Sequence, residues 1–523
     1  MNKPLYRKIG IASIIMAISV ISSRFIGLFR EVAIAGIGGV GASVDAYQAA
    51  FSLAEILNHI AATGFLSITF IPIFSKCLFE GNEERGKDFF YLILNGFGVI
   101  LLLFTAVCVY YTPSLVGILT PGLKGTPAFA DAVRMTRIVL PAQLFFFMGG
   151  LFMAVQFSKE HFVIPALTPL IYNAAIIAGG LCLGPYIGME GFAWGALVGA
   201  FLGAFVLQAI SAYRLGIRYR FFLSFTHPVF KEYLKLSLPL MLGLTMTFST
   251  EVFFRFFGSY MPEGSIGAIN YALRLTLVLS AVLGQAIGTA AYPFMARLAA
   301  EQKIAELNSL LRDTLRLLTV SILLAAWVVL LRYEIVRIIF QRSAFTSQDT
   351  LRVGNLLGFM VFGAFAFSAQ NLVSRGFYAM KNTLVPALLS TIMVLLTIPA
   401  YIWLPVHIGE KGIPLAMVFS STVQVFVLYS YWCRKTHYPS KPVYWLIGKC
   451  ALLSAILIVA IEPLQKKSLL YIGVGPWGFY KILLVSIFFV LFLLIGAKLF
   501  RIQEINTVFS RLRQLLKRSF SST

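Results

Sequence analysis

Charged side chains lie inside several long apolar stretches of this sequence. Arg24 lies deep in the first stretch, and Arg30 lies near its end. An arginine at the centre of a membrane-spanning helix costs roughly 2.5–3.5 kcal/mol on insertion scales. Side chains that carry this cost must face water, each other or a ligand, so they are the first candidates for function. The other such residues are Asp45, Glu55, His59, Glu251, Arg255, Arg274 and Arg375.

Two of the arginines have no acidic residue three or four positions away, namely Arg24 and Arg274. We interpret both as lining a wet cavity that binds a ligand. A guanidinium stays charged at all physiological pH values, and its planar fork donates two parallel hydrogen bonds to phosphate oxygens. A cavity with an excess of guanidiniums therefore suits an anionic ligand such as a diphosphate. A cation exporter would need the opposite, an excess of carboxylates.

Structural alternatives stay open at the other charged positions. Glu251 and Arg255 are four residues apart, so they can form a static ion pair on one helix face. Arg375 can extend its head group to the membrane interface, and Arg30 can lie at the outer boundary of its stretch. His59 is more often an interior polar residue than a pH-titrating group.

The composition places the chain in a membrane. Of its 523 residues, 59% are hydrophobic and 12% are charged, whereas a soluble domain has roughly 25% charged residues. The net charge of +22 would suit a nucleic-acid-binding protein. However, the basic residues lie between the apolar stretches and at their ends, so we expect no nucleic-acid partner.

Metal, disulfide and ATPase chemistry are not expected. The five cysteines and five histidines show no ligand spacing and no C-x-x-C pair. The phosphate-binding pattern G-x-x-x-x-G-K-[ST] is also missing from the sequence. The sequence therefore predicts a protein without cofactor or metal, which takes any energy from a gradient or from substrate supply.

The apolar stretches predict an all-α polytopic membrane protein with about fourteen spanning helices. Most Lys and Arg residues face the cytoplasm if both termini lie inside, although the outer loop 331–353 is an exception. This bias predicts a multi-pass protein with both termini in the cytoplasm. The predicted spans are 9–30, 44–74, 91–111, 138–156, 163–184, 190–213, 234–258, 265–292, 314–332, 355–379, 384–406, 412–432, 443–463 and 476–499.

The grouping of these spans predicts two six-helix lobes joined by a basic segment, plus two accessory helices. Lobes of this kind are common in secondary transporters, which move one lobe against the other around a midplane site. The predicted parts are an N-lobe at 1–215 with spans 1–6, a C-lobe at 216–435 with spans 7–12, spans 13–14 at 436–500, and a basic cytoplasmic tail at 501–523.

Four glycines lie at a four-residue spacing on one face of the sixth predicted span. Small residues allow helix backbones to approach closely in lipid. The stripe predicts a tightly packed helix interface, with a surface that slides between conformations as the alternative. Its members are Gly191, Gly195, Gly199 and Gly203.

Several short motifs resemble the MurJ/MviN family of lipid II flippases. Residues 23–31 read SRFIGLFRE and residues 44–47 read VDAY, which is similar to the family's first-span signature. Residues 270–275 read NYALRL, like the family's eighth span. The resemblance covers roughly residues 10–430. Further matching segments are GFLS at 64–67, FIPI at 70–73, Gly284, Gly288, Pro293, FQRSAFT at 340–346, RGFYA at 375–379, Asn382–Thr383 and Pro386.

The resemblance implies a fold, a function and a substrate. It implies the fold of the multidrug/oligosaccharidyl-lipid/polysaccharide exporter superfamily, with two six-helix lobes around a central cationic cavity. It also implies alternating access and a groove for the polyprenyl tail on the last two spans. It implies movement of lipid II, the undecaprenyl-diphosphate-linked peptidoglycan precursor, from the cytoplasmic to the outer leaflet. By position, Arg24, Arg30 and Arg274 match the family's cavity arginines, and Asp45 matches their acidic partner.

The chain departs from the family pattern on the second span. Asn58 and His59 stand where the family usually has an arginine, and Thr63 stands where it has an acidic residue. We interpret Arg255 as the residue that restores the missing charge, with the static pair to Glu251 as its alternative. The candidate substrate-binding residues are therefore Arg24, Arg30, Arg274, Arg255, Asp45, Asn58, His59 and Arg375.

Alternative functions remain. One is a flippase for another polyprenyl-linked glycan, and a second is a cation-coupled multidrug exporter of the same superfamily, which should show an excess of carboxylates in its spans. A membrane scaffold that transports nothing is the third, and the intramembrane arginines argue against it. The expected partners are lipid II and membrane lipids, with coupling to the membrane potential or an ion gradient and a monomeric state.

Overall fold

The computed structural model describes residues 3–59, 70–227, 230–231, 233–235, 249–281, 284, 286–467 and 477–505. Every regular element within these ranges is a helix, so the all-α prediction is confirmed. Parts of the second and seventh predicted spans lie outside the described residues, as do Thr63, the motif at 64–67 and most of the basic tail. The chain divides into two compact units, Met1–Ala268 with Phe340–Asp349, and Ile269–Ile339 with Thr350–Thr523.

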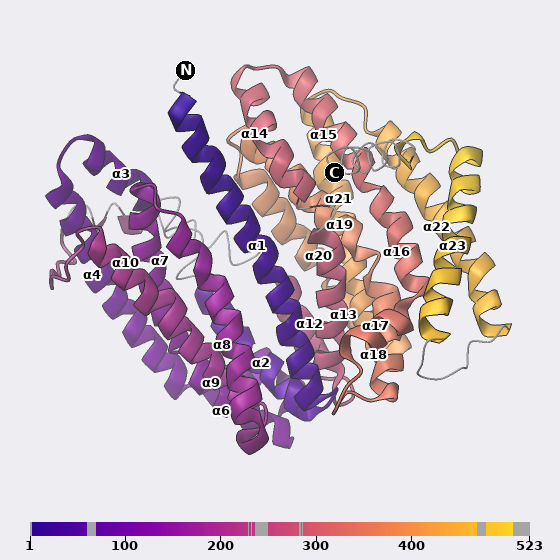
Figure 1. Cartoon of the computed structure of the whole chain (residues 1–523), viewed down its shortest axis with the longest axis horizontal. Helices are drawn as coiled ribbons and strands as arrows, with labels where there is room; N and C mark the ends of the chain where they lie inside the picture. The colour runs from indigo at the N-terminus through magenta and orange to yellow at the C-terminus, as the bar shows by residue number, and fades with distance from the viewer. Residues whose placement is uncertain are drawn as a thin grey trace, which may run out of the picture. The chain divides into compact units, whose positions relative to one another are not determined.

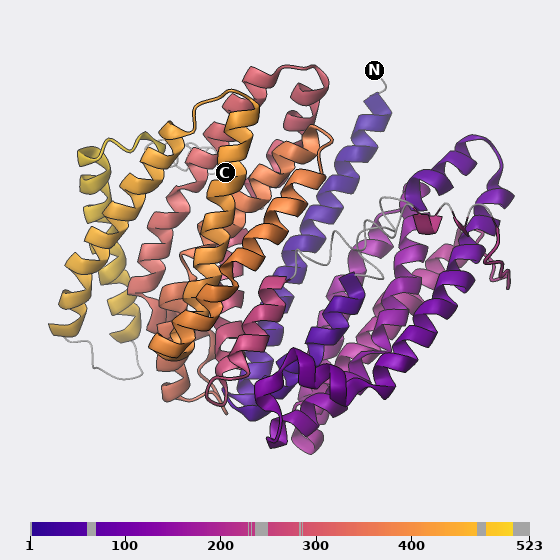
Figure 2. The same ribbon diagram turned by 180° about the vertical axis from the view of Figure 1, so that it is seen from behind.

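The first unit is built around long helices that pack side by side. Figures 1 and 2 show α8 between its neighbours α1 and α9. A second part of the unit has a core of aromatic side chains, which includes Phe70 just before α3, Phe89 of α4 and Phe147 of α7. In chain order the helices are α1 (Lys3–Gly38), α2 (Ala42–Asn58), α3 (Ile71–Phe79), α4 (Glu83–Tyr110), α5 (Thr112–Leu119), η3 (Pro121–Leu123), α6 (Pro127–Val139), α7 (Ala142–Ser158), α8 (Val163–Ile187), α9 (Glu190–Gly199), η4 (Ala200–Val206), α10 (Leu207–Arg214), α12 (Ser249–Gly258) and the first turn of α13 (Ser265–Ser280).

The glycine stripe of the sixth predicted span lies on α9 and η4, and it packs against α8. A Cβ atom added at Gly195 would lie 2.6 Å from the Ala175 carbonyl oxygen, which is closer than real Cβ atoms come. A Cβ at Gly191 would lie 2.8 Å from the Gly179 carbonyl oxygen. The two backbones therefore touch because the side chains are missing, which confirms the predicted close packing.

The second unit places α22 and α23 beside α16, as Figures 1 and 2 show. Its core joins α15, α16, α19, α21 and α22 around Leu315, Leu372 and Trp432. Its helices are the rest of α13, then α14 (Ala286–Ala300), α15 (Ile304–Leu318), α16 (Val320–Leu330), α17 (Arg332–Phe340), α18 (Ser347–Met360), α19 (Gly363–Ala379), α20 (Leu384–Ile408), η7 (Gly409–Lys411), α21 (Gly412–Lys435), α22 (Lys441–Lys467) and α23 (Trp477–Leu499).

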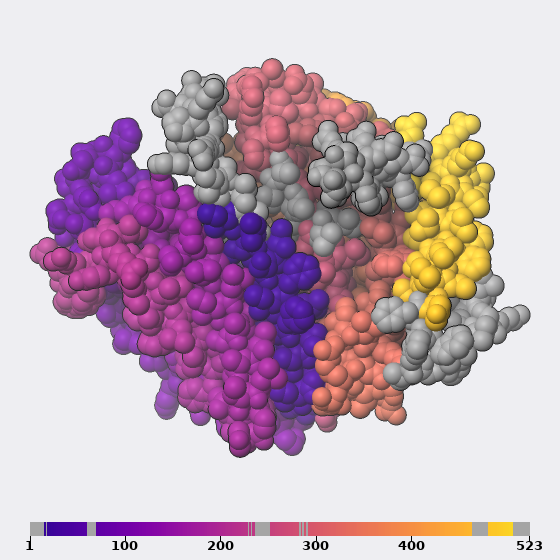
Figure 3. Space-filling model, in the orientation of Figure 1, coloured from indigo at the N-terminus to yellow at the C-terminus, as the bar shows by residue number. Residues whose placement is uncertain are grey.

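The outer surfaces of the helices are apolar. Figure 3 shows the surface of α23, whose exposed side chains belong in hydrocarbon rather than in water. Exposed apolar side chains also line α1, α4 and α20. The membrane assignment made from composition therefore agrees with the distribution of side chains over the surface. The exposed side chains of α23 include Leu483, Leu484, Ile487, Leu491 and Ile495.

Eight helical stretches of the described residues are long and apolar enough to cross a bilayer. A ninth is present if α18 and α19, which meet at a 43° bend, form one span. The stretch Leu384–Lys435 has 52 residues, which would extend about 78 Å as one straight helix against a hydrocarbon core of about 30 Å. It contains α20 and α21, which pack against each other, so it accounts for two predicted spans. The total of fourteen remains a prediction.

Candidate functional site

Arg30 is held near the end of α1 by two neighbours. Its Nη2 donates to Glu31 Oε1 at 2.7 Å, and its Nη1 donates to Asn173 Oδ1 of α8 at 3.1 Å. Asn173 in turn donates its amide N–H to the Pro169 carbonyl at 2.8 Å. Glu31 is 2% exposed, whereas the Arg30 side chain is 20% exposed. The guanidinium is therefore fixed in direction but keeps an open side.

Asp45 joins α2 to the beginning of α13. Its two carboxylate oxygens accept hydrogen bonds from the backbone N–H groups of Gly264 at 2.7 Å and Gly267 at 2.8 Å. The first N–H groups of a helix lack partners within that helix, and a carboxylate there also meets the positive end of the helix dipole. The family resemblance implies an acidic partner for the cavity arginines at this position, and in the structure Asp45 caps a helix.

Arg255 lies in the interior, and its main partner is Glu55 of α2. Its Nη1 donates to Glu55 Oε2 at 2.5 Å and its Nη2 donates to Glu55 Oε1 at 3.1 Å, which makes a bidentate pair. Glu251, the partner that the sequence spacing indicated, lies farther away at 3.8 Å. The side chain of Arg255 is 1% exposed. The ion-pair alternative from the sequence is therefore present, but with a second and closer acidic partner.

Asn58 and His59 end α2, one turn after Glu55. Nδ1 of His59 lies 2.7 Å from the carbonyl oxygen of Glu55. Because a carbonyl oxygen only accepts, Nδ1 carries the hydrogen and Nε2 is the nitrogen that can gain a proton. Both residues are half-buried. Asn58, His59 and Arg255 thus all lie close to Glu55, which makes Glu55 the centre of this part of the unit.

Arg24 lies on the exposed side of α1. Its side chain is half-buried, and large apolar side chains surround it in sequence, including Ile21, Phe25 and Phe29, which are all more than half exposed. Gly27, one turn later, has open space where a side chain would be. Arg24 therefore lies next to an exposed part of the helix surface.

Arg274 and Arg375 belong to the second unit. Arg274 is half-buried on α13. Arg375 is half-buried on α19, and its Cδ and Nε atoms would lie 3.9 Å from a Cβ added at Gly288 of α14. The stem of Arg375 therefore lies beside α14. The six other candidate residues belong to the first unit.

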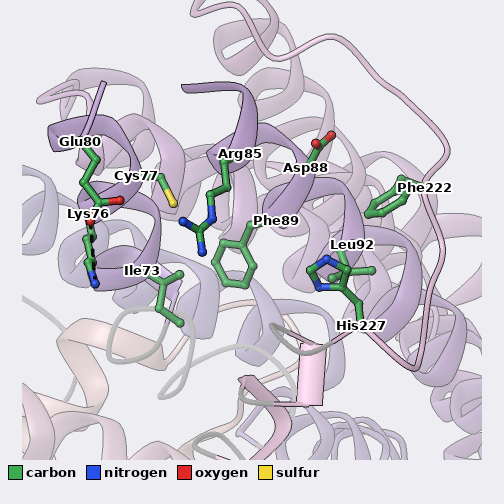
Figure 4. Close-up of a pocket in the computed structure, with 10 residues that line it drawn as sticks. All are labelled: Ile73, Lys76, Cys77, Glu80, Arg85, Asp88, Phe89, Leu92, Phe222 and His227. Atoms are coloured by element: carbon green, nitrogen blue, oxygen red, sulfur yellow. Dashed lines mark ion pairs between the residues drawn. The ribbon is translucent and has the colours of Figure 1, made fainter. Parts of the chain in front are cut away.

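A separate cavity of about 490 Å³ lies in the first unit, between α3, the start of α4 and the segment before residue 228. Figure 4 shows Arg85 pointing into it between Cys77 and Phe89, with His227 at the other end. Charges of both signs line this cavity, and its Asp88 is paired with Arg220 at 3.6 Å. None of the candidate residues predicted from the sequence lines it.

Sequence reasoning missed two residues that hold the candidate arginines. Asn173 contacts Arg30 from 143 positions away. No pattern in the sequence near Arg30 indicates this contact. Glu55 was visible as a charge within an apolar stretch, which is the signal that marked the arginines. Its pairing with Arg255, 200 positions away, was not visible.

The chain is similar to a well-defined group of known proteins. A family model described as "Lipid II flippase MurJ" matches residues 34–486. A "Probable lipid II flippase MurJ" from Buchnera aphidicola subsp. Baizongia pistaciae is 26% identical over 468 residues, which is 88% of this chain and 90% of the relative. The "Lipid II flippase MurJ" of Burkholderia cenocepacia is 26% identical over 459 residues, 84% of this chain and 86% of the relative.

Solved structures also resemble this chain. A structure titled "Lipid II flippase MurJ, inward closed conformation" matches with a TM-score of 0.77 and 26% identity, over 93% of this chain and 99% of that chain. An inward-facing multidrug resistance MATE family transporter of the MOP superfamily matches with a TM-score of 0.64 over 87% of this chain and 100% of that chain. Its identity is 13%, so this second likeness concerns the fold alone.

Proposed function

We propose that this chain, which belongs to the lipid II flippase MurJ family, moves lipid II from the cytoplasmic to the outer leaflet of the bacterial cytoplasmic membrane for peptidoglycan synthesis. The single observation that carries the proposal is the family match over residues 34–486, together with the relatives and the solved structure that share the name. The protein is accordingly a transporter of a lipid-linked oligosaccharide and not an enzyme.

The cationic side chains give the proposal its chemistry. Lipid II carries a diphosphate, and guanidiniums bind such a group with charge-assisted, bidentate hydrogen bonds. We assign this role to Arg24, Arg30 and Arg274. The fixed direction and open side of Arg30 support its assignment. Two lobes that alternate in access, the division at residue 215 and the accessory spans 13–14 are parts of the same proposal.

A depletion experiment tests the function directly. The gene is expressed in a bacterium whose own lipid II flippase can be switched off, and growth and cell shape are followed after depletion. We expect the wild-type chain to sustain growth and normal shape, because it would supply lipid II to the outer leaflet. In the same cells, the share of lipid II accessible from outside should stay near the undepleted level, whereas the empty vector should lower it several-fold. Normal membrane levels of the protein without any restoration of accessible lipid II would refute the proposal.

The orientation of the chain in the membrane is also testable. The basic-residue bias places both termini in the cytoplasm, the loop after α8 outside and the turn after α14 inside. Single cysteines are placed at Tyr186, which is 85% exposed, and at Glu301, in a chain whose five native cysteines are replaced. A membrane-impermeant maleimide should label Tyr186→Cys in intact spheroplasts and Glu301→Cys only after permeabilisation. Labelling with the opposite pattern would overturn the orientation.

A further inference from the structure

The first unit has an open groove of about 420 Å³ at its surface, formed by α4, α7, α10 and the connection after α10. Of the three helices, α7 packs against both α4 and α10 (Figure 1). The bottom of the groove consists of buried side chains, Phe90 and Leu94 of α4 and Phe152 of α7. Its rim includes the exposed side chains of Ile210 and Tyr213 of α10. The groove is therefore apolar and aromatic, and it is open to the surroundings of the unit.

The groove begins at the ends of its helices that the predicted topology places at the cytoplasmic face. Arg214, which lines it, is the last residue of α10, and α4 begins nearby in the same topology at Glu83. Leu94 lies three turns into α4, about 16 Å from the first residue of that helix. One leaflet of the hydrocarbon core is about 15 Å thick. The groove therefore covers much of the depth of one leaflet.

The connection after α10 forms one edge of the groove through Ile217 and Tyr219, and side chains of α4 hold it in place. The amide of Asn95 donates to the carbonyl oxygens of Arg220 and Phe222, both at 3.2 Å. Asn95 Oδ1 accepts a hydrogen bond from the hydroxyl of Tyr219 at 3.2 Å. Backbone carbonyls outside a helix are costly at membrane depth unless the protein satisfies them. These bonds therefore fix the edge of the groove without any ligand.

The open end of the groove has an excess of positive charge. The carboxylates at the start of α4 each pair with a basic side chain, and the pairs are Glu83–Lys159 at 2.5 Å, Glu84–Lys87 at 2.8 Å and Asp88–Arg220 at 3.6 Å. Arg214 and Arg218 are both exposed, and neither forms an ion pair within the described part of the chain. These carboxylates therefore leave two guanidiniums to interact with an anionic group.

We propose that this groove binds an anionic glycerophospholipid of the cytoplasmic leaflet, with an acyl chain along Leu94 and Phe152 and the phosphate at Arg214. The apolar bottom does not select this lipid, because the surrounding bilayer is as apolar as the groove. Selection comes from the head group, since a guanidinium donates charge-assisted hydrogen bonds to a phosphate. Basic side chains near the cytoplasmic surface also attract anionic lipids. A zwitterionic lipid brings an ammonium to this positive end and binds more weakly.

The proposed lipid site is distinct from the proposed substrate site. None of the candidate substrate-binding residues lines the groove. The inference therefore goes beyond the proposed function and does not depend on it.

Three variants separate the head-group contact from the acyl-chain contact. Arg214→Ala removes the cation, and Arg214→Lys keeps the charge without the planar fork. Ala209→Phe fills the groove and leaves Arg214 in place, because Ala209 lines the groove on α10. The control is Arg297→Ala, which removes an arginine that is 78% exposed and lies outside the groove. It lowers the net charge by the same amount as Arg214→Ala. The elution volume of each variant in size-exclusion chromatography reports whether it folds.

Native mass spectrometry of the purified full chain measures the binding of phosphatidylglycerol and of phosphatidylcholine with the same acyl chains. We expect the wild type and Arg297→Ala to bind the first phosphatidylglycerol several-fold more tightly than the first phosphatidylcholine. Arg214→Ala should lose this preference, Arg214→Lys should keep part of it, and Ala209→Phe should bind both lipids weakly. Equal binding of both lipids by the wild type, or an unchanged preference in Arg214→Ala, would overturn the inference. Displacement of the bound phosphatidylglycerol by lipid II would also overturn it, because the groove would then belong to the substrate site.

Photolabelling locates the bound lipid. The full chain is placed in vesicles that contain phosphatidylglycerol with a photoreactive group on one acyl chain, and the labelled peptides are sequenced. We expect the label to concentrate on α4, α7 and α10 in the wild type and in Arg297→Ala, and to fall several-fold there in Arg214→Ala and Ala209→Phe. Label spread evenly over the exposed helices would indicate ordinary contact with the bilayer and would contradict a specific site. The photolabelling uses no lipid II, so its failure and the failure of the depletion experiment are distinguishable.

Discussion

Replacing Arg24 or Arg274 with alanine is expected to abolish growth when the variant is the cell's sole lipid II flippase, while its membrane level stays near that of the wild type. Each charge-assisted contact to a phosphate contributes roughly 1.5–3 kcal/mol. The loss of one arginine should therefore weaken diphosphate binding by roughly 10-fold to 150-fold. Both side chains are only half-buried, so their removal should disturb the packing of the helices little.

Lysine variants separate geometry from charge at the same two positions. Arg24→Lys and Arg274→Lys keep the positive charge but lose the planar fork. We expect growth well below that of the wild type, with binding recovered only in part. The matched control is Arg297→Ala, which removes an arginine that is 78% exposed and paired with Glu301, and it should grow normally. Full growth of both alanine variants would remove Arg24 and Arg274 from the substrate site.

Arg255→Ala is expected to lower the amount of folded protein in the membrane strongly. Removal of one partner from a buried ion pair typically costs about 3–5 kcal/mol, because the other charge stays buried without compensation. Here two carboxylates, Glu55 and Glu251, would lose their common cation. The triple variant Arg255→Met, Glu55→Gln and Glu251→Gln removes all three charges and should restore the level. Fluorescence-detected size-exclusion chromatography of the solubilised protein measures both.

The second interpretation of Arg255, as a substrate-binding residue, predicts the opposite effect of Arg255→Ala on protein level. If Arg255 replaces the second-span arginine of the family, Arg255→Ala should leave the protein level intact and remove function, and His59→Arg in the same chain should bring growth back. The burial of Arg255 and its bidentate bonds to Glu55 favour the ion pair. Growth of Arg255→Ala with and without His59→Arg, normalised to membrane level, decides between the two. If neither variant changes level or growth, both assignments are wrong.

The sequence by itself determined that this is a helical membrane protein and where most of its helices run. Hydrocarbon accepts few polar groups, so each spanning helix must show a long apolar stretch, and this signal is local. The same physics indicated the functional candidates, because a charged side chain in a spanning helix costs free energy unless it faces water, a partner or a ligand. The glycine stripe was readable for a similar reason, since the approach of α9 to α8 depends on the missing side chains themselves.

Only the tertiary structure decided which charges meet. Glu251 was the partner of Arg255 visible in the sequence, because helix geometry brings residues four apart together. The closer partner, Glu55, is 200 positions away and reaches Arg255 because α2 packs on α12. In the same way Asp45, which the family resemblance implies as an acidic partner of arginines, meets two backbone N–H groups at the start of α13. Hydropathy shows which charged side chains need a partner inside the protein. Which group becomes that partner depends on helix packing, because packing brings distant parts of the chain together.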